Sequence, residues 1–288
     1  MVTRPSSSGS GWQRFWQSAT WWKAVVFVLA YLAVHLLGGR LVMALWGGVV
    51  QAAVLATPQS VFVGLVVPLL IGAVVLVLFV ASVRWFGALF GRQPVPGRRW
   101  MWVFVAIAVV PVVLRLFGID YARYGAAVVA VTFLMGVLVG FTEELVFRGI
   151  VVKLLRDAGH HELVVAVVSA ALFALSHSVN ALTGQAVLTV ALTVVYTFSF
   201  GILMYLVMRV TGRLAWAMVV HGLTDPTTAL ATGGVDTATV GAVSPLLAIA
   251  APFNLVIIAA GLVALFLIRG RVAGADGSAH VAAPADAS

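Results

Sequence analysis

The sequence predicts an all-α protein, a polytopic transmembrane helical bundle of about eight spans. Of its 288 residues, 62% are hydrophobic and only 9% are charged, and the mean hydropathy is +1.12. A soluble domain has about 25% charged residues, so the composition excludes an ordinary water-soluble globule. The apolar residues also fall in long runs, without the periodicity of amphipathic helices or alternating strands. Cysteine is absent, which excludes disulfides, thiolate nucleophiles and cysteine metal ligands.

Eight apolar runs are each close to the roughly 20 residues that an α-helix needs to cross the core of a bilayer. We expect membrane spans at residues 24–46, 60–82, 101–118, 125–148, 162–179, 187–208, 214–230 and 247–268.

The segments around these runs differ in composition. Residues 1–23 are expected to form a cytoplasmic N-terminal segment with interfacial aromatics, since tryptophans such as Trp21 and Trp22 favour the headgroup level. Residues 24–124 hold the N-terminal membrane spans, and residues 231–268 hold a loop and the last span. Residues 269–288 are small and polar, which predicts a disordered C-terminal tail.

Lysine and arginine lie mostly on one side of the predicted spans. If the N-terminus is cytoplasmic, only Arg40, Arg115 and Arg123 fall on the opposite side. The cytoplasmic set is Arg4, Arg14, Lys23, Arg84, Arg92, Arg98, Arg99, Lys153, Arg156, Arg209, Arg213, Arg269 and Arg271. This positive-inside pattern predicts that both termini are cytoplasmic, as an even number of spans requires. The net charge of +8 therefore reflects orientation in a lipid bilayer. Nucleic-acid binding is not expected, because no basic face carries interleaved aromatic residues.

Six ionisable residues lie within the apolar runs of the second half of the chain. They are Glu143, Glu144, Arg148, His177, His221 and Asp225. A charged side chain at the centre of a bilayer costs about 2.5–3.5 kcal/mol even on the mildest scale. Such groups have to pair with each other, face a watery cavity, or both, so we expect a functional site.

Three of these residues share one predicted helix. Glu144 and Arg148 are four residues apart and can form an ion pair. Glu143 is turned by about 100° and has no cation on its own helix, which suits a general base. A buried Glu144–Arg148 pair that only fixes helix packing is an equally good interpretation of that pair. Just upstream, Gly136 and Gly140 predict the close approach of a neighbouring helix.

Two further helices carry the histidines. His177 follows Phe173 by four residues and shares its helix face, and Asp225 follows His221 by four residues in the same way. Pro226 predicts a break in the last of these helices, which would line a cavity. Helical rise from the predicted turns places the groups at compatible depths, if the hairpin between the fourth and fifth spans projects about two turns into the cytoplasm. The cavity is then expected in the cytoplasmic half of the membrane.

The three segments together resemble the CPBP family, which comprises CAAX proteases and bacteriocin-processing enzymes and is also called the Abi family. Its pattern is Glu-Glu-x-x-x-Arg, then Phe-x-x-x-His, then His-x-x-x-Asn or Asp, each on a membrane helix. In this chain, the pattern is formed in the same order by Glu143-Glu144-x-x-x-Arg148, Phe173-x-x-x-His177 and His221-x-x-x-Asp225. The resemblance covers residues 125–230 and implies that this segment is a catalytic membrane core.

The resemblance implies an intramembrane glutamic endopeptidase that acts on a membrane-associated peptide or protein. Glu143 then resembles the general base, and His177 its partner in holding the attacking water. His221 and Asp225 resemble the oxyanion-stabilising pair, with Glu144 and Arg148 as support. Asp225 stands where the CAAX-processing branch has Asn, so it is either protonated or only orients His221.

Other interpretations stay open from the residues alone. The expected mechanism needs no cofactor, but Glu143, His177 and His221 could supply a His₂Glu zinc site. A non-catalytic bacteriocin-immunity or peptide-binding protein could use the same cavity. A proton-coupled transporter would use the glutamate and histidine as a relay, although the paired discontinuous helices of such transporters are missing. The Ala/Val/Arg-rich composition suggests a bacterial inner membrane, which favours bacteriocins, peptide pheromones or membrane-anchored regulators over prenylated substrates.

Overall fold

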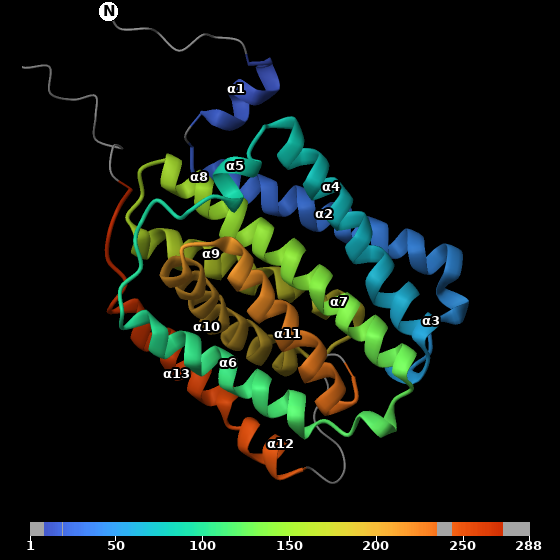
Figure 1. The fold of residues 1–288 in the computed structure, drawn as a ribbon. Helices are drawn as coiled ribbons and strands as arrows, with labels where there is room; N and C mark the ends of the chain where they lie inside the picture. The colour runs from blue at the N-terminus through green and yellow to red at the C-terminus, as the bar shows by residue number, and fades with distance from the viewer. Residues whose placement is uncertain (1–8, 19, 235–243, 273–288) are drawn as a thin grey trace, which may run out of the picture.

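The chain forms a bundle of long helices (Figure 1). The computed structural model describes residues 9–18, 20–234 and 244–272, and all regular secondary structure in these residues is helical. The predicted disordered tail lies outside the described residues from position 273 onward. The predicted all-α bundle is therefore confirmed.

Every predicted span corresponds to a helix. The long helices are α2 (Trp22–Trp46), α4 (Val67–Ser82), α6 (Met101–Gly118), α7 (Ala126–Glu144), α9 (Glu162–Ser176), α10 (Val187–Thr211), α11 (Leu214–Thr232) and α13 (Phe253–Leu265). Shorter helices are α1 (Gly11–Gln17), α3 (Pro58–Val61), α5 (Phe86–Phe90), α8 (Val152–Asp157) and α12 (Pro245–Ala250). Two π-helical stretches join short helices to long ones, Phe62–Val66 between α3 and α4 and Leu145–Val151 between α7 and α8. The predicted boundaries of the spans are thus correct to within a few residues at most helix ends.

Seven helical segments of the described chain are long and apolar enough to cross a membrane, against eight predicted spans. The remaining one is α11, which has 19 residues but also carries His221, Asp225 and four threonines. These polar residues lower its hydropathy. In the fold, α11 packs against α6, α7 and α10 (Figure 1). Its polar side chains are buried or half-buried, whereas its most exposed large side chains are the apolar Trp216 and Val219.

The close packing of α7 against α11 depends on glycine. A Cβ atom at Gly140 would lie 2.2 Å from the carbonyl oxygen of Met218, and one at Gly136 would lie 2.3 Å from that of Gly222. The predicted close approach at these glycines is confirmed. The predicted helix break at Pro226 is wrong, because α11 continues through it. Proline is tolerated inside membrane helices where neighbouring groups compensate for the lost hydrogen bond. Here the Gly222 carbonyl, which cannot accept from Pro226, lies close to Gly136 of α7.

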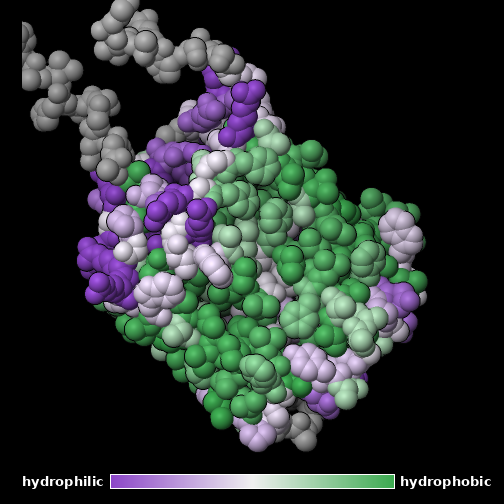
Figure 2. Space-filling view, in the orientation of Figure 1, coloured by the Kyte–Doolittle hydropathy of each residue, from purple (hydrophilic) through white to green (hydrophobic). Residues whose placement is uncertain are grey.

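The described residues near both ends of the chain lie at the same end of the bundle. The Trp12 indole donates a hydrogen bond to Ser82 Oγ (2.9 Å) after α4, and the Arg271 guanidinium donates one to the Gly159 carbonyl oxygen (2.8 Å) after α8. Figure 1 shows α1, α5 and α8 together at this end. Hydrophilic residues also gather there, whereas the middle of the molecule is covered by apolar side chains (Figure 2). This distribution is that of an integral membrane protein.

Candidate active site

A buried chain of polar contacts joins α7, α11 and the π-helical stretch. Glu144 Oε1 accepts a hydrogen bond from His221 Nδ1 (2.7 Å) and lies 3.2 Å from Arg148 Nη1. The side chains of Glu144 and Arg148 are fully buried, and that of His221 is 3% exposed. The sequence predicted the Glu144–Arg148 pair but assigned no partner on another helix to Glu144. The structure therefore links Glu144 to the imidazole that Asp225 was expected to orient.

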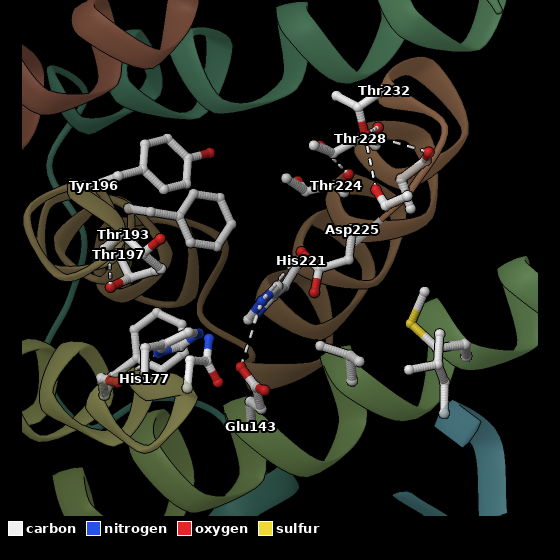
Figure 3. Close-up of a pocket in the computed structure, with 18 of the residues that line it drawn as sticks. Glu143, His177, Thr193, Tyr196, Thr197, His221, Thr224, Asp225, Thr228 and Thr232 are labelled. Atoms are coloured by element: carbon white, nitrogen blue, oxygen red, sulfur yellow. Dashed lines mark hydrogen bonds and ion pairs between the residues drawn. The ribbon is translucent and has the colours of Figure 1, made fainter. Parts of the chain in front are cut away.

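The other side of the same imidazole faces two more carboxylates. His221 Nε2 lies 3.7 Å from Glu143 Oε2 and 3.7 Å from Asp225 Oδ1. The side chains of Glu143 and Asp225 are 27% and 38% exposed, so both reach an open space (Figure 3). Both distances exceed that of a direct hydrogen bond. A small oxygen-containing group can therefore bridge His221 to either carboxylate.

Aromatic rings and a glycine hold the Arg148 guanidinium behind this centre. Its Cζ lies 4.4 Å from the centre of the Phe173 ring, as in a cation–π contact. A Cβ atom at Gly201 of α10 would lie only 2.7 Å from Arg148 Nη2, so the space for the guanidinium depends on that glycine. Arg148 itself lies in the π-helical stretch. Such stretches are frequent at functional sites, but no periodicity in the sequence predicted this one.

His177 lies where α9 ends and a 3₁₀ stretch (His177–Thr183) begins. Its Nδ1 is 3.0 Å from the Phe173 carbonyl oxygen, and its ring packs edge-on against the Phe173 ring at 4.9 Å. Because a carbonyl only accepts, Nδ1 carries the proton in this contact, and Nε2 is left as an acceptor in neutral imidazole. Phe173 also packs against the His221 ring at 5.7 Å and so separates the two histidines.

These groups line one cavity of about 780 Å³. Glu143, His177, His221 and Asp225 all belong to its wall, with Glu144 and Arg148 buried behind them. The volume lies in the range of ligand sites and suits a short peptide segment. The structure thus brings together the three segments that the sequence singled out, whereas the catalytic roles of the six residues stay predictions.

The zinc alternative requires a group of ligands. In residues 9–18, 20–234 and 244–272, no three His, Asp or Glu side chains are grouped so that they could hold a metal ion. Glu143, His177 and His221 therefore do not form a metal-binding set as they lie here.

Two polar cavity residues that the predicted site did not include are important below. Arg115 of α6 and Tyr196 of α10 both line the cavity. Arg115 was counted only as a basic residue on the outer side, although its position inside an apolar run was the signal that could have identified it. Tyr196 gave no signal, since one tyrosine in an apolar helix is ordinary.

The fold and the site define an integral membrane protein with a carboxylate–histidine centre inside a cavity between its helices. Residues 125–227 match the family described as Type II CAAX prenyl endopeptidase Rce1-like. The matched segment contains all six predicted site residues, and it confirms the resemblance to the CPBP and CAAX protease family that the three motifs indicated. It supports a CAAX-type protease in general terms. Neither a curated protein nor a solved structure matches the chain.

Proposed function

We propose that this protein is an intramembrane endopeptidase that hydrolyses a peptide bond of a membrane-associated peptide or protein, with Glu143 as the general base. The observation that carries the proposal is the meeting of Glu143, Asp225 and His221 at the wall of one cavity. Ionisable groups are costly inside a membrane and are usually functional there. The match to a CAAX protease family over these same residues narrows that function to peptide hydrolysis.

In the proposed reaction, Glu143 and His177 hold a water molecule between them. Glu143 takes a proton from this water, and the water oxygen attacks the scissile carbonyl carbon. The proton then passes from Glu143 to the leaving amine, so that the peptide C–N bond breaks and the carboxylate is restored. His177 Nε2 is the acceptor that orients the water, because Nδ1 is occupied by the Phe173 carbonyl.

The developing oxyanion is stabilised from the side of α11. When both ring nitrogens of His221 carry a proton, Nδ1 donates to Glu144 and Nε2 can donate to the oxyanion. Glu144, backed by Arg148, fixes the orientation of the ring. A protonated Asp225 adds a second donor beside Nε2. No metal takes part in this proposal.

We place the protein in a bacterial inner membrane with both termini in the cytoplasm. The positive-inside pattern supports this orientation. It is also supported by the described residues near the two ends of the chain, which lie at the same end of the bundle. The substrate then reaches the cavity from the membrane or from its cytoplasmic face.

The test is cleavage of a quenched peptide library by the purified protein in proteoliposomes. Glu143→Gln keeps the size and hydrogen bonding of the side chain but removes the base, so we expect its rate to fall by at least about 100-fold. The matched control is Asp157→Asn, whose carboxylate pairs with Lys153 outside the cavity and whose rate should be unchanged. A chelator should leave the wild-type rate intact.

Three results would contradict the proposal. Full activity of Glu143→Gln would exclude this residue as the base. Activity that a chelator removes and zinc restores would instead establish the metal-dependent form. Tight peptide binding by the wild type and by Glu143→Gln, with no cleavage of any bound peptide, would indicate a non-catalytic immunity or peptide-binding protein.

A further inference from the structure

The cavity contains a guanidinium that the proposed reaction does not use. Arg115 lies in α6, is only 6% exposed and lines the cavity. Its Nη1 is buried and has no hydrogen-bond partner in the part of the chain that the structure describes. A guanidinium carries five N–H donors, and leaving a buried charge without partners is costly. Its position is therefore typical of a group that binds a ligand anion.

Tyr196 provides a second donor beside Arg115. The two side chains are close enough to interact electrostatically, and both also interact with Asp225. The Tyr196 ring stacks on Phe200 at 6.0 Å, which fixes its orientation, and its hydroxyl group points into the cavity (Figure 3). An ionised Asp225 attracts the guanidinium, but Arg115 Nη1 has no hydrogen-bond partner among the described residues.

Three of the threonines that line the cavity do not donate a hydrogen bond into it. The hydroxyl groups of Thr197, Thr224 and Thr228 each donate to a carbonyl oxygen one turn earlier in their own helix. They offer only acceptor lone pairs to the cavity. Arg115 offers a positively charged donor to the cavity, and Tyr196 offers a neutral donor beside it.

Arg115 lies deeper in the bundle than the proposed reaction centre. The chain just before α6 and the end of α10 lie side by side, since a Cβ atom at Gly97 would lie 2.4 Å from Val210 Cα. From that level, a rise of 1.5 Å per residue puts Arg115 about 20 Å along α6 and His221 about 10 Å along α11. The difference of roughly 10 Å corresponds to about three residues of extended peptide.

We propose that Arg115 and the Tyr196 hydroxyl form a subsite for a substrate carboxylate that lies within about three residues of the scissile bond. This inference rests on the proposed function. Arg115 is then a specificity-determining residue, which selects peptides by charge and takes no part in bond cleavage. The carboxylate is either the free C-terminus of the substrate or an acidic side chain, and both present the same planar acceptor to a guanidinium.

The test measures binding, so that it does not depend on cleavage. Glu143→Gln protein in nanodiscs is titrated with three fluorescent Ala/Leu peptides: one with a free C-terminus, one amidated, and one amidated with a single Glu three residues from its end. We expect tighter binding of at least one carboxylate peptide than of the amidated neutral peptide. Adding Arg115→Gln should weaken that binding roughly tenfold or more and leave the neutral peptide unchanged.

Further variants separate recognition from structure. Arg115→Lys should retain part of the preference, because a lysine keeps the charge without the planar fork. Tyr196→Phe should weaken carboxylate binding by a smaller factor, since it removes one donor. The matched control is Arg123→Gln, an exposed arginine after α6, which should change nothing. In a cleaving enzyme, Arg115→Gln should raise KM for the carboxylate peptide without lowering kcat.

Several results would overturn the subsite. Equal weakening of all three peptides would assign Arg115 to structure or to charge balance with Asp225. No preference for a carboxylate in the parent protein would exclude the subsite directly. Arg115-dependent binding of phosphatidylglycerol with no effect on the peptides would assign the site to a lipid. If the wild type cleaves nothing but the carboxylate preference depends on Arg115, the proposed function fails while the subsite stands.

Discussion

Two buried glutamate–arginine pairs in this protein, Glu162–Arg156 and Glu144–Arg148, differ sharply in how many of their polar atoms have hydrogen-bond partners. Glu162 receives two parallel hydrogen bonds from Arg156, at 2.9 and 2.7 Å, and a further one from the Tyr205 hydroxyl. Arg209 lies 4.0 Å away, and Arg156 also donates to Gln93 (2.6 Å). Glu144 has one contact of 3.2 Å with Arg148, whose three guanidinium nitrogens have no aligned hydrogen-bond partner in the described chain.

Under the proposed function, this difference distinguishes a structural pair at Glu162 from a pair at Glu144 that supports the reaction centre. The Glu162 cluster ties α8, α9, α10 and the segment before α6 together at one end of the bundle, with every charge paired. The second partner of Glu144 is instead a histidine whose other face opens to the cavity. Buried polar groups without hydrogen-bond partners cost stability, and at the Glu144 pair they lie beside the imidazole to which the proposed reaction gives a catalytic role.

The largest effect on stability is expected at the fully paired cluster around Glu162. Glu162→Gln leaves Arg156 and Arg209 buried without a counter-charge, so we expect the free energy of unfolding to fall by about 3–5 kcal/mol. Unfolding in mixed detergent micelles measures this loss. The fraction that remains folded should cleave peptides at the wild-type rate per molecule. A stable Glu162→Gln protein that has lost activity would reverse the assignment of the two pairs.

At the Glu144–Arg148 pair we expect a smaller loss of stability than at Glu162, but a large loss of activity. Glu144→Gln still accepts a hydrogen bond from His221 but no longer offers a charge to Arg148 or to a protonated imidazole. We expect the cleavage rate to fall by roughly 100-fold or more, because the imidazole loses the charged partner that orients it. Glu144→Asp, which keeps the charge, should recover part of the rate. If Glu144→Gln lowers stability as much as Glu162→Gln and leaves the rate of the folded protein unchanged, then the pair only fixes helix packing.

Much of the fold followed from the sequence, but less of the site did. Apolar runs in the sequence predict where each helix lies along the chain. The four-residue spacing predicted the Glu144–Arg148 pair because both residues share one helix. Glu144 and His221 are 77 residues apart, and no local pattern encodes which helices face each other. The sequence did not predict the Glu162 cluster for the same reason, since its members, Glu162 included, come from four separate segments. Glu162 therefore looked like an ordinary residue flanking a span.

The glycine contact between α7 and α11 should be more sensitive to substitution than a glycine with open space around it. Gly140→Ala would place a methyl group 2.2 Å from the Met218 carbonyl oxygen and push the helix of Glu143 away from that of His221. We expect a loss of about 1–3 kcal/mol in unfolding free energy, together with lower activity. The control is Gly39→Ala in α2, which meets nothing within 4 Å and should be neutral or slightly stabilising. Equal behaviour of the two variants would show that this approach does not position the site.

The smallest effect on the cleavage rate is expected at Asp225. An ionised Asp225 would repel an oxyanion, so in the proposed mechanism this residue is protonated or only supports His221. Asn has the same shape and donates through its amide, so Asp225→Asn should change the rate by no more than roughly threefold. If Asp225 is ionised and only supports His221, the same variant also removes a negative charge that interacts with Arg115, and it should then tighten the binding of the carboxylate peptides relative to the neutral one. Asp225→Ala should lose activity. A folded but inactive Asp225→Asn protein would mean that Asp225 acts as a carboxylate, and the role of general base would then have to be tested at both Glu143 and Asp225.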